Sequence, residues 1–271
     1  ETAQLPPYLG STLRGAIGQA LHQNIGAFNY LYNNRVTKNN EQDTVNPYII
    51  VPPDIDDNPY EAGEALCFSM LLLGDAAQYV LPVIDALNEL KNSGLGVQKH
   101  PFKLIKVTHG TEQRIIWQND VFYPAATQSI PLPWRTLPNV RQVTMRICTP
   151  LRIRRGGEVI GQLDFPTVIR NITRRVEAIT QRYGGWTDSG EAERILTLSS
   201  EVATIQSQLF MKGLERFSNR LGTKLDLSGL MGMIRFEGDL TPFVPWLFAA
   251  QALHIGRNTT FGMGRVEMEF L

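Results

Sequence analysis

The chain has 271 residues, of which 43% are hydrophobic, and its 26 basic residues balance 26 acidic ones. This length allows two ordinary domains or one large one, and the composition supplies packed cores without a region biased enough for disorder. A net charge of zero excludes a uniformly basic surface but leaves local basic patches open.

The two cysteines, Cys67 and Cys148, lie in apolar runs without CxxC spacing. This usage argues against a structural disulfide or a zinc site and favours a reduced, cytoplasmic setting. No apolar run approaches about 18 residues, so we expect no membrane span and no membrane partner. The sequence begins at Glu1 rather than at methionine, from which we expect that the natural N-terminus is missing.

The first half of the sequence predicts the order helix, strand, strand, helix, strand. Apolar residues at helical spacing predict a helix over 9–31, and the runs 47–53 and 64–73 are typical of strands. A second helix should open at Gly74, and residues 102–118 predict a strand, a turn and another strand.

A proline-containing segment, 120–140, follows with few apolar runs, and its prolines are Pro124, Pro131, Pro133 and Pro138. This composition predicts a linker. We therefore expect an N-terminal domain over 1–119 and a C-terminal domain over 141–271.

The second half predicts the order strand, helix, strand, strand, helix, strand. Its helix over 165–183 carries a regular apolar stripe, with Arg170 and Arg174 on the opposite face. The other expected elements are a strand leading into a basic turn (141–161), a helical or irregular stretch (191–206), extended segments (208–221 and 229–237), a helix (241–254) and a last strand (265–271).

The order in the second half is βαββαβ, and the first half shows the same order without its opening strand. We therefore predict an α+β fold of two tandem ferredoxin-like (RRM-like) βαββαβ domains. The first strand of the N-terminal domain would be truncated, lying before Glu1 or shortened within "TAQLPP".

A glycine loop, "HIGRNTTFGMGR", joins the last helix to the last strand. Walker and dinucleotide-binding motifs do not fit it, because GK[ST] is absent and the loop leaves a helix rather than opening one. Two interpretations remain open. The glycines could cap the helix and form a turn, or the loop could bind a polyanion. In the second case its contributors would be Gly256, Arg257, Gly262, Gly264 and Arg265.

Several blocks of this sequence resemble one family. "PYLGSTLRGA" resembles the opening-helix signature P-x-x-G-S-x-L-R-G-A of the CRISPR-associated repeat-RNA-processing endoribonucleases of the RAMP superfamily. The similarity covers nearly the whole chain. Further blocks are "PYIIVPP", "GEALCFSMLLLGDAAQYVLP", "GLGVQKHPFKLIKV", "TPLRIRRGG", "RRVEAITQRYG", "RFSNR", "LSGLMGMIRFEGDL" and "HIGRNTTFGMGRV".

Two features depart from the family's pattern. A cysteine-rich insertion that many relatives carry after the first helix is absent from this sequence. Arg257 stands where relatives commonly have lysine, which keeps the positive charge.

The resemblance implies an enzyme that cuts precursor CRISPR RNA within each repeat, generally without metal or other cofactor. The ribose 2′-hydroxyl would attack, leaving a 5′-hydroxyl fragment and one that ends in a 2′,3′-cyclic phosphate or a 3′-phosphate. The partner would be CRISPR repeat RNA, with subunits of a CRISPR interference complex and a homodimer as further options.

Such chemistry needs proton transfers, for which histidine is suited by its pKa near neutrality. His22 lies on the first predicted helix, opposite Leu13 and Ile17, so it should be accessible, with Gly15, Gly18 and Gly26 beside it. The family often carries its catalytic histidine in or just after this helix, although His22 could also be an ordinary surface histidine.

Three other histidines remain. His254 starts the glycine loop, where the helix C-terminus would favour its protonated form, although its helical position near Leu247 and Ala250 favours capping or packing over catalysis. His100 and His109 are expected at the surface. Tyr30 and Tyr32, just after the first helix, could donate hydrogen bonds or simply pack.

For RNA binding, arginines are numerous in the second half. Because net charge is zero, acidic residues must gather elsewhere, which favours a basic groove over scattered surface charge. The RNP1 pattern of stacked aromatics is absent, so that binding mode is not expected. The candidates are Arg152, Arg154, Arg155, Arg170, Arg174, Arg216 and Arg220.

Three functions are thus in competition. The first is the endoribonuclease with His22 and His254 as catalytic candidates. The second is a RAMP-type subunit that holds guide RNA without cutting it, and the third is a protein-interaction scaffold. The opening-helix signature and His22 favour the enzyme.

Overall fold

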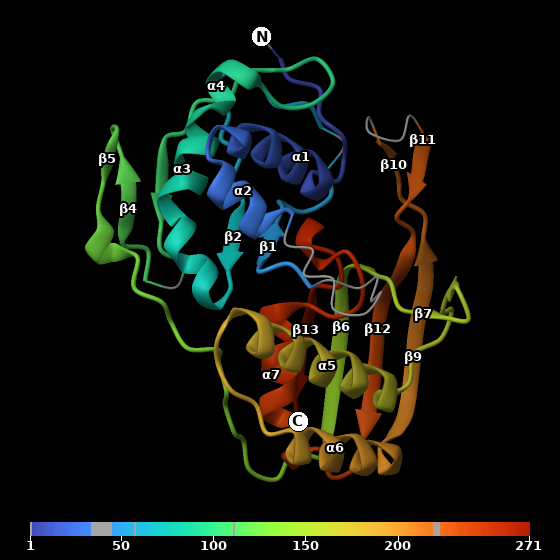
Figure 1. Ribbon diagram of the computed structural model, residues 1–271. Helices are drawn as coiled ribbons and strands as arrows, with labels where there is room; N and C mark the ends of the chain where they lie inside the picture. The colour runs from blue at the N-terminus through green and yellow to red at the C-terminus, as the bar shows by residue number, and fades with distance from the viewer. Residues whose placement is uncertain (1, 34–44, 57, 111, 219–222) are drawn as a thin grey trace. The chain divides into compact units, whose positions relative to one another are not determined.

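The computed structural model describes residues 2–33, 45–56, 58–110, 112–218 and 223–271, and it has an α+β fold (Figure 1). The chain divides into two units, Glu1–Ile130 and Pro131–Leu271, at a point inside the 120–140 segment. Over the described ranges, no helix combines the length and apolar character that crossing a membrane requires.

Unit 1 opens with a broken helix rather than the continuous one expected over 9–31. Helix α1 (Gly10–Ala20) is followed by the 3-10 turn η1 (Leu21–Gln23) and then by α2 (Ile25–Leu31). The break lies at Asn24, whose backbone leaves the helical region and whose side chain accepts a hydrogen bond from the N–H of Ala27. Asparagine is a strong N-cap, which explains why a new helix begins here.

The remaining elements of unit 1 are short. Residues 74–93 form η2 (Gly74–Tyr79), α3 (Val80–Asn88) and α4 (Leu90–Ser93), so the single helix expected from Gly74 is divided into three segments. The strands are β1 (Tyr48–Val51), β2 (Ser69–Leu72), β3 (Lys106–Thr108), β4 (Ile115–Gln118) and β5 (Val121–Phe122), and η3 (Pro124–Ala126) ends the series.

These strands form two small antiparallel sheets, β1-β2 and β3-β4-β5, and the described residues contain no four-stranded sheet in this unit. Pro52 and Pro53 end β1, because proline lacks the N–H that a sheet ladder needs. Where the opening strand was expected, residues 2–7 form only an isolated bridge between Ala3 and Tyr60. Leu13, Ile17 and Tyr48 anchor the core.

Unit 2 is built on one antiparallel sheet with the strand order β13-β6-β12-β9. Its main elements follow one another as strand, helix, strand, strand, helix, strand, which confirms the order predicted for this half. They are β6 (Gln142–Leu151), α5 (Phe165–Tyr183), β9 (Ala203–Lys212), β12 (Gly229–Glu237), α7 (Val244–Leu253) and β13 (Val266–Phe270).

Helices α5 and α7 contact each other and pack on one face of this sheet (Figure 1). Val143, Met145 and Ile147 of β6 are buried, and the ring of Phe165 meets those of Phe236 and Phe243 at centroid distances of 5.0 and 4.9 Å. The edge-to-face geometry of these rings closes the core beneath α5.

Several elements of unit 2 extend the predicted pattern. Two hairpins are added, β7 (Arg154–Arg155) with β8 (Glu158–Val159), and β10 (Glu215–Ser218) with β11 (Thr223–Asp226). The stretch expected to be helical or irregular over 191–206 is α6 (Ser189–Leu198), η4 (Ser199–Glu201) and the start of β9. Asp188 caps α6 by accepting from the N–H groups of Gly190 and Glu191. The turn η5 (Thr241–Phe243) precedes α7, and η6 (Thr259–Phe261) lies within the glycine loop.

Candidate functional site: a histidine in unit 1 and a basic surface in unit 2

His22 lies in η1, directly after α1, and its side chain is exposed as expected. Its imidazole stacks on the ring of Phe28, with centroids 3.8 Å apart and planes inclined by 30°. Phe28 in turn stacks on Tyr32, and Tyr32 on Tyr48. The histidine therefore stands at the outer end of a row of rings that reaches the core, which limits the directions its ring can take.

The tyrosines after the first helix have packing roles. The Tyr32 hydroxyl donates to the carbonyl of Arg14 at 2.9 Å, and burial raises its pKa well above the ordinary value. A Cβ at Gly18 would come within 2.5 Å of the Tyr32 ring. The space left by this glycine is thus taken by Tyr32 rather than left for RNA, whereas Gly15 does face open space. Tyr30 stacks on Tyr79.

The other two histidines of unit 1 are half-buried rather than at the surface. His100 is held in a bridge with Leu95. His109 lies with its Nε2 3.2 Å from the carbonyl of Gln128. The Nε2 of His100 and the Nδ1 of His109 are buried without a hydrogen-bond partner among the described residues. His22 is therefore the exposed histidine among the four.

The glycine loop, residues 254–265, is folded against the end of β6. The N–H of Arg257 donates to the carbonyl of Arg152 at 2.8 Å, and that of Gly264 donates to Pro150 at 3.2 Å. The hydroxyl of Thr149 donates to the carbonyl of Gly262 at 2.8 Å and accepts from the N–H of Arg265 at 2.9 Å. The loop is therefore a fixed part of unit 2.

Close approach explains its glycines. Gly256, Gly262 and Gly264 all have positive φ. A Cβ at Gly256 would come within 2.6 Å of the Arg152 carbonyl oxygen, and one at Gly264 would overlap the carbonyl oxygen of Ile255. Gly262 and Gly264 are buried and their N–H groups bond within the unit, while Gly256, Arg257 and Arg265 are half-exposed.

His254 is buried beneath this loop, with 3% of its surface exposed. Its Nδ1 donates to the carbonyl of Met263 at 3.2 Å. We expected the helix end to favour the protonated form, which is wrong. Burial, together with the positive charges of Arg175 and Arg265, lowers the pKa of His254 to about 4, so it is neutral at pH 7.

The backbone of His254 is strained, with φ 57° and ψ 165°, a conformation that is almost restricted to glycine. A side chain retained at such a position is held there by its surroundings. The bond to Met263 ties the end of α7 to the far side of the glycine loop. This geometry fits an anchoring role for His254.

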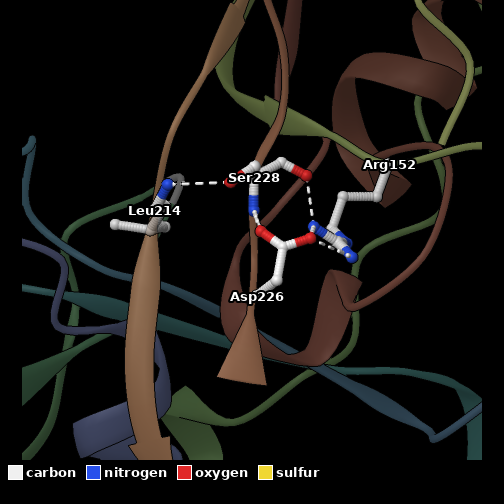
Figure 2. Close-up of polar contacts among 4 residues, drawn as sticks. All are labelled: Arg152, Leu214, Asp226 and Ser228. Atoms are coloured by element: carbon white, nitrogen blue, oxygen red, sulfur yellow. Dashed lines mark hydrogen bonds and ion pairs between the residues drawn. The ribbon is translucent and has the colours of Figure 1, made fainter. Parts of the chain in front are cut away.

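Arg152 was predicted to contact RNA, and the structure instead buries it, with 3% of its surface exposed. Its guanidinium donates to the carbonyl of Ser228 and pairs with Asp226 at 3.4 Å (Figure 2). Ser228 also accepts from the N–H of Leu214 through its hydroxyl. Because its side chain is used to join the end of β6 to the turn before β12, Arg152 is a structural residue.

The other predicted arginines of unit 2 lie at the surface. Arg154 and Arg155 are exposed on the β7–β8 hairpin, Arg174 is exposed on α5 and Arg170 is half-exposed there. Arg155 donates to the hydroxyl of Thr167 at 3.3 Å, which ties the hairpin to the start of α5. We name these four arginines the basic strip. Arg220 and the side chain of Arg216 lie outside the described residues.

The pKa of Asp164, the N-cap of α5, is affected by the positive charges of two arginines in this strip. Burial alone would raise its pKa, but hydrogen bonds from Thr167 and the charges of Arg155 and Arg170 hold the pKa below its ordinary value. Arg155 and Arg170 are therefore close enough to act on the same carboxylate. Since Arg170 and Arg174 are one turn apart, the strip runs from the hairpin along α5.

Arg175 was not singled out from the sequence. It is 7% exposed, its Nε donates to the carbonyl of Leu253 at 2.6 Å, and its Nη2 has no hydrogen-bond partner among the described residues. Burial lowers its pKa to about 10. The sequence could have indicated its burial, because Arg175 lies three residues after Ile172 and four before Ile179, a spacing that places it on the apolar stripe of α5.

In chemical terms, unit 2 presents cations and a rigid glycine loop around the end of β6, features suited to a phosphate backbone. In unit 1, the exposed imidazole of His22 offers two ring nitrogens for hydrogen bonds or proton transfer.

Comparison with known proteins shows which families the two parts of this chain resemble. Residues 1–130 match the family model AF_1859_N, described as an N-terminal domain, and residues 145–266 match the model of the CRISPR-associated endoribonuclease Cas6. An uncharacterized protein of Archaeoglobus fulgidus is 22% identical over 283 aligned positions, which cover 96% of this chain and 91% of that protein.

Solved structures resemble the chain in fold. A Cas6 product complex has a TM-score of 0.62 at 15% identity, covering 99% of this chain and 97% of that one. A partial Cas6-RT-Cas1–Cas2 complex has a TM-score of 0.63 at 11% identity, covering all of this chain and 44% of that one. Residues 145–266 therefore resemble the Cas6 family of CRISPR-associated endoribonucleases, the resemblance that the sequence blocks predicted, and the fold of the chain is similar to that of solved Cas6 structures.

Proposed function

We propose that this protein cuts precursor CRISPR RNA within its repeats by a metal-independent transesterification. The ribose 2′-oxygen forms a bond to the adjacent phosphorus as the bond from phosphorus to the 5′-oxygen breaks. A base takes the 2′-hydroxyl proton, and an acid gives a proton to the leaving 5′-oxygen. The products are a 5′-hydroxyl fragment and one ending in a 2′,3′-cyclic phosphate or, after hydrolysis, a 3′-phosphate.

The observation that carries this proposal is the match of residues 145–266 to the Cas6 endoribonucleases. We assign one of the two proton transfers to His22. Its exposure allows contact with RNA, and its stacking on Phe28 limits how the imidazole can turn. A fixed orientation favours catalysis because less freedom is lost on reaching the transition state.

His254 is the other catalytic candidate from the sequence, and we propose for it a supporting role. A neutral histidine that is buried and bonded to Met263 supports an anchoring function in the glycine loop rather than contact with the reacting atoms.

We assign RNA binding to the basic strip and to the half-exposed residues of the glycine loop, Gly256, Arg257 and Arg265. Arginine binds phosphate oxygens through two parallel N–H groups, and each such contact releases counterions from the RNA. Gly262 and Gly264 would contribute through the shape that they give to the loop.

For the architecture, we propose two tandem ferredoxin-like domains, 1–119 and 141–271, joined by the linker 120–140, with unit 1 lacking its first strand. The protein would act in the cytoplasm on CRISPR repeat RNA. Subunits of a CRISPR complex are further partners, which is supported by the Cas6 portion of the Cas6-RT-Cas1–Cas2 complex.

A cleavage assay in EDTA tests the proposal. The full-length protein is incubated with labelled repeat RNA, and with a copy whose 2′-hydroxyl at the cut site is replaced by hydrogen. We expect one specific cut in the first RNA, and binding without a cut in the second. Binding with no cut in either RNA would instead indicate a guide-RNA-holding subunit, and no binding would indicate a scaffold.

A further inference from the structure

A second surface feature of unit 1 lies outside the groups assigned above. It is a pocket of about 390 Å³, bordered by the ends of α3 and α4, by residues 103–105 and by the turn between β4 and β5. Its polar lining residues are Asn88, Lys91, Lys103, Asn119 and Asp120.

One wall of the pocket is apolar and held by the core. It is formed by Leu104, Ile105 and Trp117. Trp117 is 7% exposed and packs in a cluster with Ile84 of α3, so this wall is fixed. Ile105, by contrast, is 64% exposed, which leaves an apolar surface open to a ligand. A flat, apolar group such as a nucleobase would cover it.

The lining of the pocket also carries positive charge. Lys91 and Lys103 are both exposed, and neither forms an ion pair with any described residue. Two lysines on the border of one pocket attract an anion, and phosphate is the anion that accompanies a nucleobase in RNA.

The turn at the rim is rigid. Gln118 of β4 pairs with Val121 of β5, so Asn119 and Asp120 form a two-residue hairpin loop. Both have positive φ, 50° and 60°, as a tight type I′ turn requires. Their side chains, together with Asn88, supply amide and carboxylate groups that can bond to the polar edge of a base.

We propose that this pocket binds one nucleotide of single-stranded RNA, with its phosphate on Lys91 and Lys103 and its base against Ile105. Asn88 and Asn119 bond to the base edge. The inference rests on the RNA binding proposed above but not on His22. The same nucleotide chemistry could come from a free mononucleotide, so the experiment separates the two sources.

The test measures RNA affinity for the full-length protein in EDTA, using labelled repeat RNA with single-stranded flanks and hydrogen at the 2′ position of the cut. Lys91→Ala/Lys103→Ala should bind about tenfold more weakly, with a salt dependence lower by about one to two counterions. Lys99→Ala is the matched control, since Lys99 is exposed in the same unit but outside the pocket. Equal affinity of the double variant and the control would overturn the inference.

A second variant addresses the base. Ile105→Ala should weaken RNA binding about threefold, less than the loss of an aromatic stacking contact, because an aliphatic side chain covers a base without stacking on it. Val97→Ala, at a side chain that is 91% exposed and outside the pocket, should leave it unchanged. Equal affinity of Ile105→Ala and Val97→Ala would contradict the proposal that the base packs against Ile105. Failure of the wild-type protein to bind the RNA at all would contradict the proposed function instead.

Free adenosine and uridine monophosphates form the last arm. If the pocket takes its nucleotide from RNA, neither should bind at concentrations below about 1 mM, because a single exposed contact supplies little affinity. Micromolar binding that Lys91→Ala/Lys103→Ala abolishes would instead show a mononucleotide site and overturn the assignment to RNA.

Discussion

The glycine loop and the β7–β8 hairpin are two turns of unit 2 with similar composition and different physical character. Both combine glycine with arginine, and both have glycines at positive φ. In the loop, a Cβ at Gly264 would overlap the carbonyl oxygen of Ile255. In the hairpin, a Cβ at Gly156 or Gly157 would meet no atom within 4 Å.

The arginines beside these turns differ in the same way. Arg152 lies two residues before β7 and is buried, where it contacts Ser228 and Asp226. Arg154 and Arg155 are exposed. Within a few residues of one basic, glycine-containing segment, one arginine can stabilise the fold while its neighbours remain available to bind a ligand. Tertiary packing, rather than composition, decides which residue has which role.

The largest predicted difference between the two turns is the loss of stability when one glycine of each is replaced by alanine. Gly264→Ala should lower the free energy of unfolding by about 3 kcal/mol or more, because backbone has to move as well as adopt positive φ. Gly157→Ala should cost only about 1 kcal/mol, from the conformational penalty alone. Urea denaturation of the two variants measures the difference, and similar losses would show that the loop is as open as the hairpin.

His254 provides the next effect. Its pKa is lowered in the folded state to about 4, so below pH 6.5 the unfolded chain binds the proton more readily. The stability of the folded protein should therefore fall by about 3 kcal/mol between pH 6.5 and pH 4, in addition to the change from other groups.

Isolating this contribution requires His254→Asn, which removes the titrating ring. The difference in unfolding free energy between wild type and variant should shrink as pH falls from 6.5 to 4. A difference that stays constant over this range would mean that His254 is not buried as neutral imidazole.

Arg152 and Arg154 give a smaller contrast. Arg152→Ala should cost about 2 kcal/mol of stability, since it leaves the Ser228 carbonyl and Asp226 without their buried partner. Arg154→Ala should change stability by less than about 0.5 kcal/mol, as is usual at an exposed position. Thermal unfolding of both variants decides this, and a stable Arg152→Ala protein would contradict the structural role.

The smallest effect is expected along the basic strip. Arg154→Ala and Arg174→Ala should each weaken binding of uncut repeat RNA about threefold to fivefold, because each removes one exposed phosphate contact. Filter binding at two salt concentrations measures it. Arg194→Ala is the control, because Arg194 is paired with Glu191 on α6 and is not one of the four strip arginines. A loss as large as in the strip would indicate a general effect of charge rather than a defined phosphate contact.

Some elements of the fold were predictable because local chemistry specifies them. Helix α5 runs from Phe165 to Tyr183, the predicted bounds, since Asp164 caps its start and Gly184 at φ 88° ends it. Other features depend on tertiary contacts. The break at Asn24 within an apolar helical pattern, and the division of unit 1 into two small sheets, follow from capping and strand pairing that periodicity does not report.

The candidate site shows the same limit. The exposure of His22 follows from helical position, and it was predicted. The burial of Arg152 depends on Ser228, which is 76 residues away along the chain, so a local sequence pattern could not predict it. His254 is neutral because Arg175 and the glycine loop enclose it, and the helix-end argument considered neither.

The central claim is that His22 performs proton transfer in RNA cleavage, and single-turnover cleavage of repeat RNA by His22→Ala tests it most directly. With the protein in excess over the RNA and above the dissociation constant, and with EDTA present, the cleavage rate should fall at least about 100-fold while RNA affinity changes little. Phe28→Leu, which removes the ring beneath His22, should give an intermediate rate. Cleavage by His22→Ala at the wild-type rate would contradict the claim.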